Sequence, residues 1–225
     1  IGSGHCGKLH FLIVIFFNQK PPGYILGGFL MSVAFVLGNG ISRQAVDLPR
    51  LRGLGRIYGC NALHRDFVPD VLVATDRPIA EHIQALGYAL EHEFYTRHPV
   101  PGRGAQTIPE AYHPYSSGPA ALGIALDQGA RRVYLLGFDL GANQHQQFNN
   151  IYASTEFYKK SGSVPTYTGN WIRQVSKLIQ THPKVEFFRV WGATTARLAE
   201  LDGLSNLWHL QIAEFRDRIN TQKDL

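Results

Sequence analysis

Residues 116–141 read SSGPAALGIALDQGARRVYLLGFDLG, and this stretch decides the fold. Small residues open it, and a helix is indicated by apolar residues that share one helical face: Ala121, Leu122, Ala125 and Leu126. Gly129 then favours the end of that helix, and the apolar run RRVYLLG (131–137) follows as a buried strand. A helix that leads directly into an apolar strand is typical of α/β proteins.

The rest of the chain repeats this alternation. Further strands are predicted from short apolar runs: SVAFVLG (32–38), RIYGCN (56–61), DVLVATD (70–76), EFYTR (93–97) and KVEFFRV (184–190). Helices are predicted for RPIAEHIQALG (77–87) and WIRQVSKLIQTHP (171–183). Apolar runs without polar alternation suit strands that are covered on both faces. We therefore expect an α/β, Rossmann-like fold whose mostly parallel sheet has helices on both faces.

One α/β domain is predicted for residues 31–225. Two segments are expected to be loops, a proline-rich one at 98–115 and a long polar one at about 141–170, and the tail from Leu198 is expected to be mostly helical. Residues 1–30 do not fit the alternation. Because Met31 is the single methionine and directly precedes the first clear strand, we expect residues 1–30 to be a non-native or upstream extension. The alternative is an extra strand or helix packed on the domain.

Composition narrows the classes of partner. The chain has 22 Lys and Arg against 17 Asp and Glu, and the excess is scattered, so no specific nucleic-acid partner is expected. The apolar runs HFLIVIFF (10–17) and YILGGFLMSVAFVLG (24–38) are shorter than the roughly 18 residues of a membrane span. Cys6 and Cys60 form no disulfide framework or zinc motif, which favours a reducing compartment and a cytoplasmic location.

Candidate site residues stand where the predicted strands end. In open α/β sheets, ligands bind outside the carboxyl ends of the strands. The residues at those ends and at the start of the central helix are Gly38, Asn39, Gly40, Asn61, Asp76, Ser116, Ser117, Gly118 and Asp139. We expect this set to frame a nucleotide. Arg43 stands where a dinucleotide fingerprint has its third glycine, so classical NAD binding is not expected.

Several of these residues allow two interpretations. Ser117 either helps to hold a phosphate or ribose at the helix start or only caps the helix. Asn61 either binds a base or ribose or caps the following turn. Asp76 and Asp139 either share a magnesium ion or act as a helix cap and an arginine partner.

The polar loop supplies the candidate catalytic groups. Tyr152 and Tyr158 are expected to have a functional role, because long aromatic loops often cover active sites. His145 and His113 are of the type that serves as a general acid or base, or they are solvated loop histidines. Cys60 is expected to be a buried structural thiol.

The order of four short motifs resembles that of the bacterial sialyltransferases that cap lipooligosaccharide. The motifs are GNG (38–40), CN (60–61), SSG (116–118) and GARRVYLLGFD (129–139), within a similar region of residues 33 to about 175. The resemblance implies a metal-independent enzyme that transfers sialic acid from CMP-sialic acid. It also implies that the cytidine nucleotide is held by Asn39, Asn61, Ser117 and Gly118.

The chain departs from that family at three positions. The family's arginine ahead of the serine is Pro114 here, and its tyrosine after the aspartate is Gly141. Its base histidine is replaced by Asn170, which by its position is a candidate catalytic residue, although its amide cannot act as a general base. Tyr152, Tyr158 or His145 is then left to take over part of the chemistry.

Two other resemblances point elsewhere. Pro69, Asp70 and Asp76, followed by Gly137–Leu140, resemble the hydroxymethylpterin pyrophosphokinases, which implies magnesium and ATP as ligands. GCNALHRDFVPD (59–70) and the segments around NNIYASTEFY (149–158) resemble proteins of tailed phages of marine bacteria, which implies no activity.

Three functions follow from these patterns. The leading hypothesis is a glycosyltransferase that needs no cofactor and moves a sugar from a CMP-sugar donor to a glycan acceptor by direct displacement. The alternatives are a magnesium-dependent pyrophosphokinase and a non-catalytic nucleotide- or partner-binding module, phage-encoded in origin. The sequence leaves open the general base and the oligomeric state, a homo-oligomer included.

Overall fold

Eight strands form one all-parallel sheet in the computed structural model, which describes residues 24–26 and 29–223. The strands are β3 (Val33–Leu37), β4 (Arg56–Cys60), β5 (Val71–Ala74), β6 (Glu93–Thr96), β7 (Gln106–Thr107), β8 (Arg132–Leu136), β9 (Glu186–Trp191) and β10 (Leu207–Gln211). Their order across the sheet is β10-β9-β8-β3-β4-β5-β6-β7. The expectation of a Rossmann-like α/β fold is confirmed.

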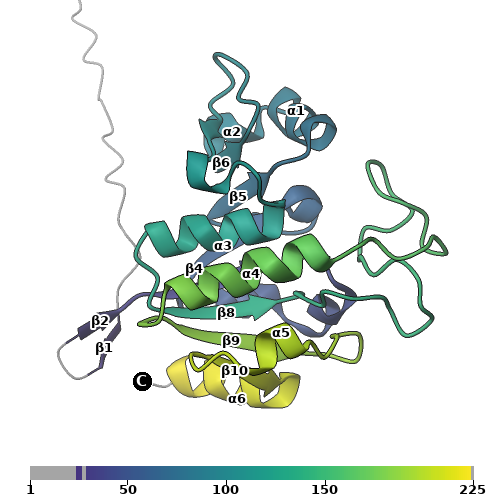
Figure 1. Ribbon diagram of the computed structural model, residues 1–225. Helices are drawn as coiled ribbons and strands as arrows, with labels where there is room; N and C mark the ends of the chain where they lie inside the picture. Colours follow the sequence, from purple (N-terminus) through teal and green to yellow (C-terminus); the bar gives the residue numbers. More distant parts are fainter. Residues whose placement is uncertain (1–23, 27–28, 224–225) are drawn as a thin grey trace, which may run out of the picture.

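Helices cover both faces of this sheet (Figure 1). The α-helices are α1 (Arg77–Ala85), α2 (Tyr88–Glu91), α3 (Ser117–Asp127), α4 (Gly169–Thr181), α5 (Ala199–Asp202) and α6 (Ile212–Lys223). Short 3-10 helices occupy η1 (Ile41–Ala45), η2 (Leu48–Leu51), η3 (Asn61–Arg65) and η4 (Glu110–Tyr112). Figure 1 shows α3 and α4 side by side over one face.

Two apolar cores explain why the strand sequences lack polar alternation. Ala34 and Val36 of β3 pack with α3 and α4, whereas Phe35 and Leu37 of the same strand pack on the opposite face with α1 and α6. Successive side chains of a strand point to opposite faces, so a strand covered on both sides is apolar at every position. All five residues of β3 are buried accordingly.

The strand order reverses beside β3. From β3 the chain adds β4 to β7 on one side, and it then returns to place β8, β9 and β10 on the other. The connections that leave the carboxyl ends of β3 and β8 therefore diverge, which opens a crevice at this edge. The candidate residues Asn39 and Asp139 follow these two strands.

Some local elements were not predicted. The tail after Leu198 is mostly helical, as expected, but strand β10 lies between α5 and α6 and pairs in parallel with β9. The loop predicted at 98–115 contains β7 and η4. Part of the expected extension forms an antiparallel pair of strands, β1 (Tyr24–Leu26) and β2 (Phe29–Met31).

The remaining N-terminal predictions, including those on Cys6 and residues 10–17, lie outside the described residues. Among the helices that the structure describes, none has the length and apolar character needed to cross a membrane.

Candidate functional site

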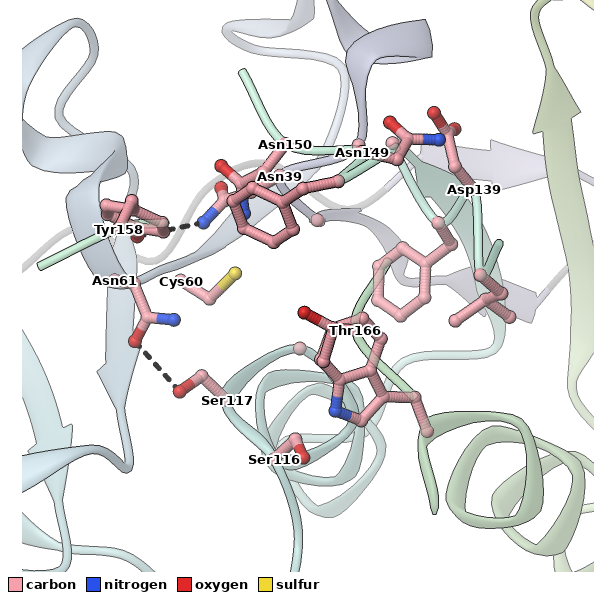
Figure 2. Close-up of a pocket in the computed structure, with 18 of the residues that line it drawn as sticks. Asn39, Cys60, Asn61, Ser116, Ser117, Asp139, Asn149, Asn150, Tyr158 and Thr166 are labelled. Carbon is pink, nitrogen blue, oxygen red and sulfur yellow. Dashed lines mark hydrogen bonds between the residues drawn. The ribbon is translucent and has the colours of Figure 1, made fainter. Parts of the chain in front are cut away.

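A cavity of about 410 Å³ opens at the point where the strand order reverses (Figure 2). Its walls come from the ends of β3, β4, β5 and β8, from the start of α3, from the loop at 148–166 and from Trp171 of α4. The predicted residues on these walls are Gly38, Asn39, Gly40, Asn61, Asp76, Ser116, Ser117, Gly118, Asp139 and Tyr158. The structure thus brings together every strand-end residue that the sequence singled out.

Glycines let the two diverging connections touch. The Gly38 N–H donates to the Leu136 carbonyl at 2.8 Å, and the Gly40 N–H donates to the Gly137 carbonyl at 2.9 Å. A Cβ atom on Gly38 would lie 2.5 Å from the Gly137 oxygen, which is closer than real side chains approach. The GNG motif therefore serves this backbone crossing, whatever ligand it also meets.

Asn39 is held in one orientation on the cavity wall. Its Oδ1 accepts a hydrogen bond from Arg43 Nη1 at 2.8 Å, so its Nδ2 is the donor side of the amide. Nδ2 donates to the Tyr158 hydroxyl at 3.4 Å, which leaves its second hydrogen for the cavity. The side chain presents a hydrogen-bond donor to any ligand there.

Asn61 presents a second donor. Its φ of 52° lies in the left-handed region, which asparagine tolerates better than most residues. Its Oδ1 accepts a hydrogen bond from the Ser117 hydroxyl at 2.8 Å, and Figure 2 shows its nitrogen turned toward the cavity. Two amide nitrogens, from the ends of β3 and β4, therefore line the same space.

Ser117 stands inside the helix and not at its cap. Ser116 occupies the N-cap position, where its side chain makes no capping hydrogen bond. The buried Ser117 hydroxyl accepts the Thr75 N–H at 3.0 Å and joins β5 to α3. The capping interpretation of Ser117 is therefore wrong. At the start of α3 the first backbone N–H groups, including that of Gly118, have no partner within the helix and carry partial positive charge.

Asp139 is buried and surrounded by donors. Its two carboxylate oxygens accept hydrogen bonds from the Ser42 backbone and hydroxyl, from Thr194 at 2.6 Å and from Thr195 at 3.3 Å. These bonds connect the segments that follow β3, β8 and β9. Asp76 lies at the cavity wall, exposed, with no side-chain capping bond to α1.

A metal site would need several oxygen, nitrogen or sulfur ligands in one place. Within the described ranges, no group of three or more His, Cys, Asp or Glu side chains is arranged to hold a metal ion. The pairing of Asp76 with Asp139 around magnesium stays a prediction.

The two loop tyrosines have different surroundings. Tyr158 lines the cavity, and its hydroxyl accepts the Asn39 amide and the Ala62 N–H at 3.3 Å. Tyr152 is buried behind the wall, where its hydroxyl accepts Arg43 Nη2 at 2.8 Å. Burial raises the pKa of both phenols above the ordinary value. Both are therefore neutral near pH 7, and each phenol keeps a proton to donate.

The other proposed catalytic residues lie apart from the cavity. His145 is exposed and contacts Gln144 at 3.2 Å. Asn170 accepts a hydrogen bond from Arg173 and lines a smaller hollow of about 190 Å³ with Arg173 and Lys177. Neither residue is among those that line the main cavity. Their catalytic roles stay predictions.

Sequence reasoning missed Arg43 as part of the site. This residue is 4% exposed and connects Gly38, Asn39 and Tyr152 by hydrogen bonds. An arginine in a turn is normally expected at the surface. The single available signal was its position two residues after GNGI. That position had indicated only that the third glycine of a dinucleotide fingerprint is missing.

No family model matches the chain, and no curated protein matches it. Solved structures do match, at low identity. The sialyltransferase CstII from Campylobacter jejuni in complex with CMP has 14% identity, with 71% of this chain and 79% of that chain covered, at a TM-score of 0.46. The same enzyme with a trisaccharide acceptor and CMP has 14% identity, covers 77% and 86%, and gives 0.47.

An α-2,3-sialyltransferase from Campylobacter jejuni in apo form has 12% identity, covers 91% of this chain and 100% of that chain, and gives a TM-score of 0.45. Similarity at this level leaves the chemistry of the cavity to be argued from the residues of this chain. The resemblances to pyrophosphokinases and to phage proteins stay predictions.

Proposed function

We propose that this chain is a glycosyltransferase that binds a CMP-sugar in the cavity between β3 and β8. One observation carries the proposal: the amide nitrogens of Asn39 and Asn61 and the first N–H groups of α3 converge on one cavity at the reversal of strand order. Amide and backbone donors suit the carbonyl, hydroxyl and phosphate oxygens of a nucleotide. The same residues carry the resemblance to sialyltransferases.

The reaction would be a direct displacement at the sugar. An acceptor hydroxyl attacks the anomeric carbon as the bond from that carbon to the phosphate oxygen breaks, and CMP leaves with the bonding electrons. The Tyr158 hydroxyl is available to donate its proton in a hydrogen bond to the leaving phosphate, because its two described bonds are both accepted. The acceptor's proton goes to a base that is not assigned.

Asn61 offers the sharpest variant. Asn61→Asp keeps the oxygen that accepts from Ser117 and keeps a residue that tolerates the left-handed backbone. It replaces the amide donor by a second oxygen and a negative charge. We therefore expect the variant to fold normally and to lose nucleotide affinity at least tenfold, since a ligand oxygen that loses its donor and meets a carboxylate instead costs roughly 1–3 kcal/mol or more.

The test is thermal unfolding of the full chain with CMP, UDP, GDP, ATP and CMP-sialic acid, each with magnesium and with EDTA. A ligand that binds the folded state alone raises Tm by mass action. We expect CMP and CMP-sialic acid to raise Tm equally in both conditions, with the shift lost in Asn61→Asp. Release of CMP from CMP-sialic acid would then distinguish an enzyme from a binding module.

Other outcomes favour the alternatives. A shift with ATP that requires magnesium would contradict the proposal and favour the pyrophosphokinase. Binding of CMP without release of CMP or transfer to any glycan would favour the non-catalytic module. No shift with any ligand would contradict nucleotide binding in this cavity.

A further inference from the structure

A buried cation lies directly behind the cavity wall. Arg43 is the middle residue of η1, and its guanidinium forms three hydrogen bonds, to the Gly38 carbonyl at 2.7 Å, to Asn39 Oδ1 and to the Tyr152 hydroxyl. All three acceptors are neutral groups. Its centre also lies 5.5 Å from the centroid of the Tyr152 ring. Only 4% of the residue is exposed.

The positive charge of Arg43 has no direct counter-ion in the part of the chain that the structure describes. The ion pairs found there within 4.0 Å involve other arginines and His209, and none of them includes Arg43. Burying a charge is costly unless an opposite charge or an anionic ligand compensates it. A guanidinium bonded to neutral acceptors beside a cavity therefore favours an anion in that cavity.

The carboxylates in the neighbourhood, those of Asp66, Asp76 and Asp139, do not neutralise the positive charge of Arg43. Asp66 interacts with the Tyr152 hydroxyl, and it is exposed to solvent. Asp76 is exposed at the cavity wall. Asp139 is already surrounded by hydroxyl and N–H donors, and its charge acts on another arginine: burial lowers the pKa of the Arg189 guanidinium, and Asp139 offsets part of that shift. Solvent screens the two exposed carboxylates strongly.

The hydrogen bond from Arg43 to Asn39 extends the electrostatic effect of the buried charge to the cavity. Arg43 donates to the oxygen of the amide, which polarises the group and makes its Nδ2 hydrogens stronger donors. It also fixes which end of the amide faces the ligand. The planar fork suits this task, because one guanidinium bonds both Gly38 and Asn39 from the same nitrogen and still reaches Tyr152.

We infer that Arg43 is the positioning residue that recognises the ligand's phosphate, acting through Asn39. The inference rests on the proposed function, and it extends it in two ways. It places the anionic group at the β3 end of the cavity, beside Asn39 and Tyr158, and it supplies the compensating positive charge from the protein itself. The uncharged nucleoside then extends toward Asn61 and the start of α3.

The experiment compares CMP with cytidine, which lacks the phosphate. Dissociation constants for both ligands are measured by isothermal titration in EDTA for the full-length wild type, Arg43→Met and Arg43→Lys. Arg65→Met is the control, because Arg65 is an exposed arginine that contacts the same loop through Thr155 and carries the same charge. Circular dichroism and Tm report whether each variant folds.

We expect Arg43→Met to weaken CMP about tenfold and to leave cytidine nearly unchanged, which matches the loss of one charge-assisted contact. Arg43→Lys keeps the charge but not the fork, so the preference for CMP should fall by about threefold. Arg65→Met should change neither ligand. If Arg43→Met does not fold, the Arg43→Lys result decides.

A merely structural role for Arg43 would weaken CMP and cytidine by the same factor, and that result would overturn the inference. The inference would also be overturned if the ratio of the cytidine and CMP dissociation constants in Arg43→Lys equalled that of the wild type. The same holds if Arg65→Met changed this ratio as much as Arg43→Met does. Wild-type protein that binds neither ligand would instead overturn the proposed function itself. The two failures are therefore distinguishable.

Discussion

The buried carboxylate of Asp139 leads to a quantitative prediction about stability. Asp139→Asn preserves the shape of the side chain but removes the charge and one acceptor oxygen. Four donors meet that carboxylate: the Ser42 N–H and hydroxyl and the hydroxyls of Thr194 and Thr195. The amide oxygen can stay with the Ser42 N–H, and hydroxyl groups that face the new NH2 must rotate to accept.

The magnitude follows from those four bonds. A hydrogen bond to a charged group contributes roughly 1.5–3 kcal/mol, against roughly 0.5–1.5 kcal/mol for a neutral pair. Four hydrogen bonds lose their charge assistance, and rotation of the hydroxyls recovers part of the lost energy. The free energy of unfolding therefore falls by about 3 kcal/mol. For a chain of this length that corresponds to roughly 6–12 °C in Tm.

The assay is urea denaturation followed by circular dichroism, with Asp76→Asn as the matched control. Asp76 also lines the cavity but is exposed and makes no capping bond. Its replacement should change stability by less than about 0.5 kcal/mol. If Asp139→Asn costs no more than Asp76→Asn, the reasoning that assigns Asp139 to holding three segments together is refuted.

Two further predictions concern the cavity wall. Ser117→Ala should lower the free energy of unfolding by about 1–3 kcal/mol, because the buried Thr75 N–H loses its acceptor, whereas Ser116→Ala should stay within about 0.5 kcal/mol in the same urea titration. Equal losses would contradict this assignment. Burial raises the pKa of the Cys60 thiol to about 12, so its alkylation by iodoacetamide, followed by mass spectrometry, should accelerate about tenfold per pH unit from pH 7 to 10. A plateau near pH 9 would show an ordinary thiol.

The apolar strands were predictable because two covering layers impose an unbroken apolar pattern on them. β3 is buried at every position, and its sequence alone indicated a central strand. β10 was missed for the opposite reason. It lies at the edge of the sheet, and Trp208 and Gln211 are exposed, so its sequence carries no continuous apolar run. Its short length next to α6 made the tail resemble a helix.

The site was predictable to the extent that strand ends define it. Asn39, Asn61 and Asp139 follow apolar runs, and parallel strands bring their ends to one edge. Hydrogen bonds between side chains that are far apart in the sequence were not predictable. The contact between Arg43 and Tyr152 joins residues 109 positions apart, and it depends on how the long loop packs over η1. The same holds for Ser117, whose hydroxyl meets Thr75 because β5 happens to end beside α3.

The central claim is that the cavity between β3 and β8 binds a nucleotide through its amide donors. Isothermal titration of the full chain with CMP in EDTA, compared between the wild type and Asn61→Asp, tests it most directly. The account predicts saturable binding of one CMP per chain that weakens at least tenfold in Asn61→Asp, whose Tm stays close to that of the wild type. No binding by the wild type, or equal affinity in both proteins, would contradict it.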